Sequence, residues 1–554
     1  MLPPELEELS LDGNSLKGVL TESHFMKLSK LKTLELSYNS LLALRFRTTW
    51  IPLFQLNYLG LASCKLGPRF PNWLQTQNSL YRLDISNAGI SGSVPEWFWN
   101  ASIPSINISH NSLVGEIPNL PLELASVSVI DLHSNQFEGV IPSFFSQASL
   151  LFLSRNKFSD MVQFLCGNNT YTFLVVLDIS NNELGHLPNC WSHLKSLEFI
   201  DLSNNKLSGK VPVSMGSLVE MKALVLRNNS LIGELPSSLQ NCFELALLDI
   251  GENKLSGPLP SWIGESLQQL KLLSLRANGL NGSLPWHLCY LWRIRVLDLS
   301  QNNFSKDIPT CIKNFTVIAQ KRNDSDEYSH HVSAYNRDAF SYSYDFNILM
   351  TWKYVEYILK NPERLFRIID LSNNNLTGKI PDELGYLVGL ISLNLSRNSL
   401  SGEINPLIGN LKSLEVLDLS RNHLSGKIPS TLAQLDTLGV LDLSNNRLHG
   451  KIPNGRHLQT TFDASSFAGN IDLCGMPLDK ICPEDRAPTL LHASPITKED
   501  HEKSDFLKAF FMSMGLGFPI GFWGLLVPIL IKRSWRHAFI RLLNKLIDNI
   551  YVIY

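Results

Sequence analysis

Carboxylates and hydroxyls recur at fixed intervals along most of this 554-residue sequence. Asp and Ser alternate with apolar residues in segments such as FIDLSNN, and Asp201, Asp249, Asp298 and Asp418 are examples. Catalysis would need a nucleophile, a base and a group that orients the base at one place. Here the same residues repeat along the chain without such a set. The pattern predicts a binding protein rather than an enzyme, and we expect no cofactor.

Two repeats carry other side chains where most have Asp and Ser, and these side chains suit ligand binding. One repeat has Val225 and Arg227, and another has Ser274 and Arg276, with Gly251 between them. Exposed apolar and arginine side chains are typical anchors at interfaces. We therefore predict that these residues are exposed and contact a ligand. Ordinary drift of a repeat is the alternative interpretation.

Neither the histidines nor the cysteines indicate a metal site. His330 and His331 are adjacent but lack a second group of ligands. Six of the eight cysteines are placed for local disulfides in an oxidising compartment. Cys64 is expected to be a buried, unreactive thiol, and Cys242 has no evident partner. The expected pairs are Cys166 with Cys190, Cys289 with Cys311, and Cys474 with Cys482.

The elements that must position these residues come from an internal repeat. Leu197, Met221, Leu245 and Leu270 open successive units of nearly equal length. Each unit follows L-x-x-L-x-L-x-x-N-x-L-x-G-x-[IVL]-P, which is the spacing of leucine-rich repeats. The L-x-L part predicts a short strand with one face inward. No coil buries its own leucines, so the coils must stack into a solenoid.

The asparagine after each strand marks the repeats across the whole chain. Its amide is expected to bond buried backbone groups of neighbouring coils. Seventeen strands about 4.8 Å apart would form a concave parallel sheet on the order of 80 Å long. The ladder positions are Asn14, Asn39, Cys64, Ala88, Asn111, Asn135, Asn156, Asn182, Asn205, Asn229, Asn253, Asn278, Asn302, Asn374, Asn398, Asn422 and Asn446.

The period predicts the domain organisation. About thirteen repeats fill residues 1–314, a non-repeat island follows at 315–364, and four repeats fill 365–462. The island is rich in aromatic residues, and Tyr342, Tyr344 and Trp352 are candidates for ligand contact. A solvated linker is the alternative for this segment. Its only hint of helical periodicity is in VEYILKNPERLF. A cysteine cap is expected at 463–483 and an acidic spacer at 484–508.

The C-terminal region predicts a single membrane crossing. Residues 509–531 are uncharged, and a helix of that length spans a bilayer core. The short tail, 532–554, is basic, which places it in the cytoplasm and the repeats outside the cell. Ser513, Gly517 and Gly521 are spaced at i, i+4 and i+8. We predict that this stripe of small residues contacts a partner helix.

Glycosylation sequons support an extracellular location. The last of them begins at Asn394. Separately, the overall net charge of −2 gives no indication of nucleic-acid binding. The candidate sites begin N-x-[ST] without proline at x. They are Asn100, Asn107, Asn168, Asn228, Asn281, Asn303, Asn314, Asn323, Asn375 and Asn394.

The chain enters a repeat directly after Met1, without a signal peptide or an N-terminal cap. Because a bare coil leaves its apolar stacking face in water, we expect that the natural protein has further sequence before this point.

These features together resemble the plant leucine-rich-repeat receptor-like proteins, particularly the immune group that includes the fungal-xylanase receptors. The segments SMGLGFPIGFWGLLVPILIKRSWRHAFIRLL and MTWKYVEYILKNPERLFRIIDLS carry the resemblance most specifically. The island departs from the group at Lys353-Tyr354, where Lys-Gly is frequent. The resemblance implies a kinase-less receptor at the plasma membrane that binds an extracellular ligand and signals through a receptor kinase. A non-signalling decoy and a wall-associated enzyme inhibitor are the alternatives.

Overall fold

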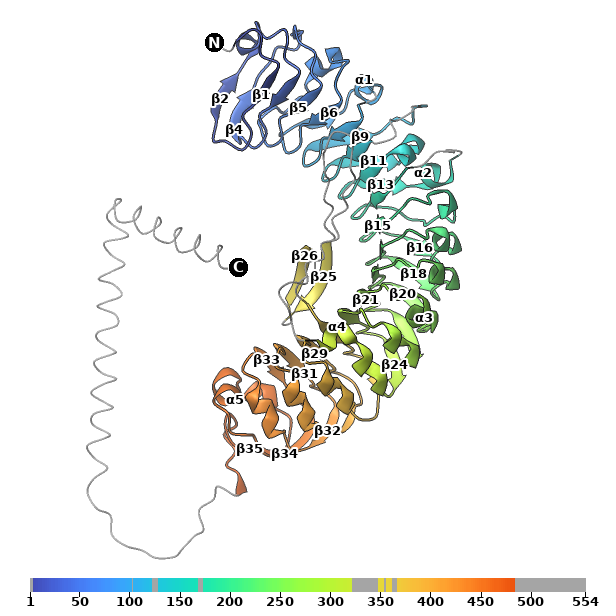
Figure 1. Ribbon diagram of the computed structural model, residues 1–554, viewed down its shortest axis with the longest axis vertical. Helices are drawn as coiled ribbons and strands as arrows, with labels where there is room; N and C mark the ends of the chain where they lie inside the picture. The colour runs from blue at the N-terminus through green and yellow to red at the C-terminus, as the bar shows by residue number, and fades with distance from the viewer. Residues whose placement is uncertain are drawn as a thin grey trace, which may run out of the picture. The chain divides into compact units, whose positions relative to one another are not determined.

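The repeats form one unit of stacked coils in a computed structural model. The model describes residues 3–101, 103–121, 128–167, 173–320, 347–352, 355–360 and 366–483. The chain divides into two compact units, Met1–Pro483 and Glu484–Tyr554. Within the first unit, the coils follow one another in chain order along an arc (Figure 1).

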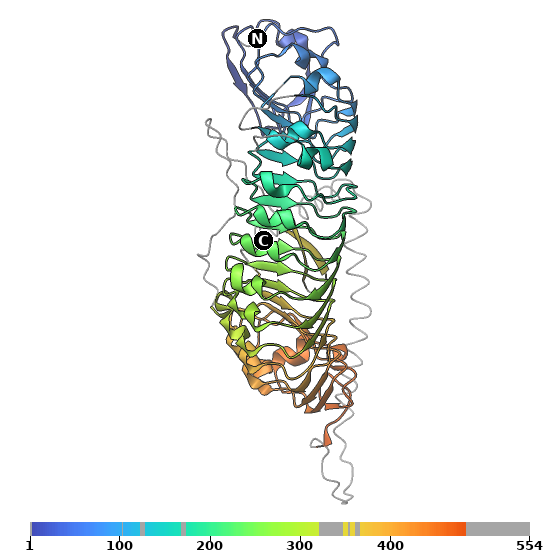
Figure 2. The same cartoon turned by 90° about the vertical axis from the view of Figure 1, so that its right-hand side faces the viewer.

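One parallel sheet of seventeen strands runs through the described repeats. Each strand pairs in register with the strand of the next coil, so the predicted leucine-rich-repeat solenoid is confirmed. Figure 2 shows the strands from a second side. They are β1 (Glu8–Ser10), β3 (Thr33–Glu35), β5 (Tyr58–Gly60), β6 (Arg82–Asp84), β8 (Ser105–Asn107), β10 (Val129–Asp131), β12 (Leu150–Phe152), β14 (Val176–Asp178), β15 (Phe199–Asp201), β17 (Ala223–Val225), β19 (Leu247–Asp249), β21 (Leu272–Ser274), β23 (Val296–Asp298), β27 (Ile368–Asp370), β29 (Ser392–Asn394), β31 (Val416–Asp418) and β33 (Val440–Asp442).

A second set of parallel strands, two to five residues long, follows the turn in most coils. Leu207, which refills the core in its repeat, is fully buried there. These strands form sheets along one side of the solenoid. They are β2 (Lys17–Leu20), β4 (Leu41–Leu44), β7 (Ser91–Ser93), β9 (Ser112–Glu116), β11 (Gln136–Val140), β13 (Lys157–Asp160), β16 (Ser208–Gly209), β18 (Ser230–Gly233), β20 (Lys254–Pro258), β22 (Gly279–Ser283), β24 (Asn303–Lys306), β28 (Asn375–Leu376), β30 (Ser401–Glu403), β32 (His423–Gly426), β34 (Arg447–Lys451) and β35 (Asp472–Cys474).

The return segments are mostly short 3₁₀ helices, because each coil is short and leaves room for only one or two helical turns. Proline precedes many of them, as Pro212 precedes η5, and its fixed φ suits the entry to a turn. The helices are η1 (Glu22–His24), η2 (Asn72–Thr76), α1 (Glu96–Trp99), η3 (Ser143–Gln147), α2 (Val162–Cys166), η4 (Trp191–His193), η5 (Val213–Ser217), η6 (Ser237–Asn241), α3 (Trp262–Ser266), η7 (Trp286–Tyr290), η8 (Thr310–Asn314), α4 (Thr316–Ala319), η10 (Asp382–Tyr386), η11 (Pro406–Asn410), η12 (Ser430–Gln434), α5 (Arg456–Thr461) and η13 (Ala464–Phe467).

The ladder asparagines satisfy backbone groups inside the coils, as predicted. The Nδ2 atom of Asn302 donates to the carbonyl oxygens of Leu275, Leu299 and Ser300 at 2.9, 3.2 and 3.1 Å. Its Oδ1 atom accepts from the backbone N–H of Leu280 at 3.1 Å. One side chain therefore joins its own turn to the preceding coil.

The ladder continues directly across the island. Asn374 Nδ2 donates to the carbonyl oxygen of Leu299 at 3.0 Å, and its Oδ1 accepts from Phe304 N at 3.0 Å. The strands of the same two coils, β23 and β27, pair in parallel. The island is therefore an insertion between two stacked repeats, and it does not separate two solenoids.

Part of the island forms a hairpin rather than the helix that its sequence suggested. Strands β25 (Asn347–Trp352) and β26 (Val355–Lys360) pair antiparallel, with Met350 opposite Tyr357. The segment contains many β-branched and aromatic residues, which favour strands. Figure 1 shows the hairpin on the inner side of the arc.

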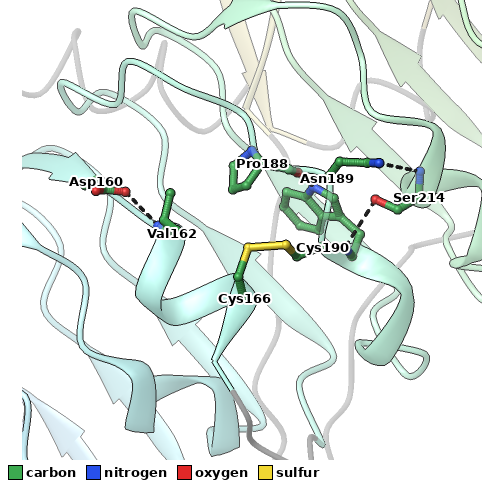
Figure 3. Close-up of a disulfide and its surroundings, with 8 residues drawn as sticks. Asp160, Val162, Cys166, Pro188, Asn189, Cys190 and Ser214 are labelled. Carbon is green, nitrogen blue, oxygen red and sulfur yellow. Dashed lines mark hydrogen bonds between the residues drawn. A yellow bond between two sulfur atoms is a disulfide. The ribbon is translucent and has the colours of Figure 1, made fainter.

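Three disulfides join the cysteine pairs that the sequence suggested: Cys166–Cys190, Cys289–Cys311 and Cys474–Cys482. Figure 3 shows the first of them, which links the end of α2 to the start of η4 in the next coil. Trp191 beside it is fully buried and donates from Nε1 to the Pro188 carbonyl oxygen at 2.8 Å. Cys64 and Cys242 are free and buried, and burial raises the pKa of both thiols.

We predict that Asn302→Ala lowers the free energy of unfolding by roughly 2–4 kcal/mol, because buried backbone groups of two coils lose their partner. Thermal and urea unfolding of the purified full chain measure this effect. Asn410→Ala is the control, since Asn410 is an exposed asparagine at the end of η11. Equal stability of the two variants would contradict the structural role of the ladder.

Candidate functional site: the concave face

The outward residues of the long sheet form columns, because adjacent strands are in register and about 4.8 Å apart. The first outward column is apolar and buried from β10 to β27, and it makes a second hydrophobic cluster. Its members from successive strands are Val129, Leu150, Val176, Phe199, Ala223, Leu247, Leu272, Val296 and Ile368.

The next outward column is acidic. Asp201 is typical, because its Oδ1 atom accepts the backbone N–H of Ser203 at 2.9 Å. Gly251 N donates to Asp249 Oδ1 at 3.0 Å in the same way. These bonds turn the chain after the strand and hold one carboxylate oxygen against the backbone. They explain why the Asp-x-Ser pattern recurs without a catalytic role.

Some of these carboxyl groups lie side by side. Asp178 aligns with Asp201, and Asp298 aligns with Asp370. Burial, reinforced by the charge of Asp178, raises the pKa of Asp201 to about 7. Burial and the charge of Asp298 raise the pKa of Asp370 to about 7. The concave face therefore carries carboxyl groups that take up protons near neutral pH.

The sequence prediction that the candidate anchors are exposed is wrong for most of them. Val225, Arg227, Gly251 and Ser274 are buried, whereas Arg276 is partly exposed. The buried ones are flanked by residues of adjacent strands, which lie one full repeat away in the sequence. That coverage cannot be read from a single repeat.

Arg227 lies over acidic neighbours instead of facing solvent. Its Nη1 atom is 3.9 Å from Asp249 Oδ2, and its Nη2 atom donates to Glu252. The side chain is only 8% exposed. Removing it would leave buried negative charge without compensation. Arg227 therefore compensates the negative charge of its neighbours within the sheet.

Comparison with known proteins gives the repeats their context. Family models described as leucine-rich repeat match residues 172–207 and, in addition, 79–101, 220–242, 293–315, 366–387, 389–411, 413–435 and 437–455. Receptor-like protein EIX2 of Solanum lycopersicum is 45% identical over 533 residues, which are 95% of this chain and 52% of the relative. Receptor-like protein EIX1 of the same species is 43% identical over 536 residues, which are 96% of this chain and 52% of the relative.

The chain belongs to the leucine-rich-repeat receptor-like proteins of plants. It spans about half the length of EIX2 and EIX1. No catalytic fold is indicated by these relatives or by the repeats.

Solved receptor ectodomains have the same architecture as this receptor-like protein. Arabidopsis HAESA, in complex with the peptide hormone IDA and the co-receptor SERK1, is 30% identical with a TM-score of 0.63 and covers 86% of this chain and 76% of its own. Arabidopsis GASSHO1/SCHENGEN3, in complex with CASPARIAN STRIP INTEGRITY FACTOR 2, is 27% identical with a TM-score of 0.58 and covers 86% and 60%.

The sequons of the receptor-like protein fall into different environments. Asn107 and Asn394 occupy the acidic column, and their Nδ2 atoms donate to Asp84 and Asp370 at 3.3 and 3.2 Å. A glycan on these amide nitrogens would crowd the neighbouring carboxyl groups of the sheet, so the structure disfavours both sites. Asn168 lies outside the described residues, as does Asn323. The exposed candidates are Asn100, Asn228, Asn281, Asn303, Asn314 and Asn375.

Most of the other predicted residues lie outside the described part of the chain. Tyr342 and Tyr344 lie outside the described residues, and Trp352 ends β25. The predicted membrane segment, 509–531, with its stripe of Ser513, Gly517 and Gly521, is also outside them. Within the described part of the chain, no helix combines the length and apolar character needed to cross a membrane.

Sequence analysis missed a histidine pair on the concave side. His110 follows β8, and His133 follows β10 in the next coil. Their Nε2 atoms are 2.8 Å apart, and Asp131 contacts the other side of the His133 ring. The sequence did contain a sign of this pair, because His133 occupies an outward position where most repeats have Ser. Arg227 was noticed because it occupies the same position in its own repeat.

We predict that the receptor-like protein is more stable at pH 5.5 than at pH 7.5. Asp201 and Asp370 have raised pKa values in the folded chain, compared with 3.8 for an ordinary carboxyl group. Between about pH 4 and 7 the folded state therefore binds more protons than the unfolded state, and stability falls as pH rises. Thermal unfolding of the full chain should show a transition several degrees higher at pH 5.5.

The pH prediction has a matched variant. Asp201→Asn with Asp370→Asn imitates the protonated state and should flatten the profile between these two pH values. Asp463→Asn, which changes an exposed carboxyl group whose pKa is lowered by hydrogen bonds to Ser465, should leave the profile unchanged. A double variant with the slope of the natural chain would contradict the assignment.

Proposed function

We propose that this chain is the ligand-binding and membrane-anchored part of a plant cell-surface receptor without a kinase of its own. The similarity to receptor-like protein EIX2 over nearly the whole chain is the observation that carries the proposal. The resemblance of the sequence to the fungal-xylanase receptors favours a role in defence. It makes a fungal xylanase the first ligand to test.

The ligand is a peptide, a protein or a microbial elicitor that binds on the concave side. Solved relatives such as HAESA hold a peptide hormone, which supports this class of ligand. Arg276 is the predicted anchor with a partly exposed side chain. Val225, Arg227, Gly251 and Ser274 form the layer beneath the contact surface. The island supplies further contacts through its aromatic residues.

The receptor is proposed to cross the plasma membrane once, with the repeats outside and the basic tail inside. An inward signal is proposed to pass through a separate protein. A membrane-spanning receptor kinase that packs against Ser513, Gly517 and Gly521 would provide it. Small residues permit the close backbone approach that drives helix association in lipid.

We predict that Tyr342→Ala, Tyr344→Ala and Trp352→Ala together weaken xylanase binding at least tenfold without changing the melting temperature. Rigid aromatic side chains contribute much of the energy at binding surfaces. Surface plasmon resonance with the immobilised full chain measures the affinity. The control is Tyr386→Ala, because Tyr386 is an aromatic residue of η10 that is 55% exposed. Unchanged affinity in the triple variant would remove the island from the contact surface.

We predict that Gly517→Leu with Gly521→Leu abolishes co-purification with the kinase, because leucine side chains hold the two helices apart. The double variant should still reach the cell surface and bind ligand. Gly515→Leu is the control, because at i−2 from Gly517 it lies on the opposite side of a helix from the stripe. Normal co-purification in the double variant would show that the segment serves only as an anchor.

A further inference from the structure

Two histidine rings from neighbouring coils meet at the concave side of the solenoid. The Nε2 atoms of His110 and His133 are 2.8 Å apart, the ring centroids are 4.4 Å apart, and the planes are inclined at 82°. His110 is exposed, and the His133 side chain is 28% exposed. Both side chains therefore contact solvent.

The separation of the two rings limits how their nitrogens can face each other. The centroid of an imidazole lies about 1.1 Å from its nitrogens, so rings aligned across a straight hydrogen bond of this length would have centroids about 5 Å apart. Two nitrogens that instead point to a common centre at about 2.1 Å would have centroids about 4.3 Å apart. The observed separation of 4.4 Å is close to the second arrangement, and a bent hydrogen bond between the two rings gives the same separation.

Asp131 fixes the state of one ring. Its Oδ1 atom lies 2.5 Å from His133 Nδ1 and also accepts the backbone N–H of His133 at 3.2 Å. A carboxylate at Nδ1 keeps the proton on that nitrogen and leaves the Nε2 lone pair available. This carboxylate–histidine contact is the usual support of a metal-binding histidine.

We propose that His110 and His133 form a two-histidine site for a divalent transition metal that prefers imidazole nitrogen, with Cu²⁺ bound more tightly than Zn²⁺. At a metal–nitrogen distance of about 2.1 Å, the observed nitrogen spacing gives an angle of about 85° at the metal. That angle suits the square-planar geometry of Cu²⁺, which also leads the divalent metals in affinity.

The site remains open on the side away from the two rings. Among the described residues, no group of three or more His, Cys, Asp or Glu side chains could hold a metal. Water therefore completes the coordination of the free protein, or a donor atom of a bound partner does so. Arg155 of the next coil is exposed, and its positive charge reaches both rings, which weakens binding.

The test uses the full chain, purified in detergent through a tag without histidine and titrated with Cu²⁺ alone at pH 7.5. We expect one Cu²⁺ per chain at this site, with an electron paramagnetic resonance spectrum split by two equivalent nitrogens. His110→Ala and His133→Ala should each weaken binding at least tenfold and remove the two-nitrogen pattern. Asp131→Asn should weaken binding about tenfold while both nitrogens remain bound.

The control is His423→Ala, which removes an exposed histidine of β32 and should leave the spectrum unchanged. His110→Gln and His133→Gln, checked by thermal unfolding, repeat the test with polar replacements that preserve the fold. If either histidine variant binds Cu²⁺ as tightly as the natural chain, or the natural spectrum shows one nitrogen, the pair is a hydrogen bond between two imidazoles and the proposal fails.

Discussion

The structure depends on the need to satisfy the backbone groups at the turn that follows the strand of each coil. Each coil turns sharply after its strand and leaves N–H and C=O groups directed into the core. Leaving such groups unpaired costs about 1–3 kcal/mol each. The ladder asparagine supplies both a donor and an acceptor, and at Asn205 it bonds Ile179, Leu202 and Ser203 as donor and Leu184 as acceptor. The register of the coils follows from this contact.

The same register determines the chemistry of the concave face. Since equivalent residues lie about 4.8 Å apart, a repeated Asp becomes a row of neighbouring carboxyl groups. The structure accommodates this row in three ways. Asn394 donates to Asp370, Arg227 lies over Asp249, and Asp201 has a pKa near neutrality. The concave face thus carries charge that depends on the pH of its surroundings.

The fold was predictable from sequence because its period is local and repeated. Leu-x-Leu, the following Asn and the Gly-x-[IVL]-Pro segment each report one physical requirement, and the pattern resumes after the island. The paired cysteines were predictable for a related reason, since the partners lie close in sequence, within one coil or in adjacent coils. The hydrogen bond from Asn107 Nδ2 to Asp84 was not predictable, because the two residues lie in different repeats.

The candidate site was less predictable because exposure depends on residues one coil away. Val225 and Arg227 differ from their equivalents, and that difference correctly identified an unusual position. It did not show that Asp249 and Glu252 would bury the guanidinium group. Likewise, His110 and His133 come from different repeats, and only the stacking of coils brings their rings together.

The central claim is that one continuous ladder holds the coils together across the island. Hydrogen–deuterium exchange of the full chain tests it most directly at the Phe304 amide, which donates to Asn374 from the far side of the insertion. The account predicts that Phe304 exchanges as slowly as Leu280 and Leu400, whose amides donate to ladder asparagines away from the island. Exchange at Phe304 that is orders of magnitude faster than at these two amides would show two separate solenoids and would contradict the account.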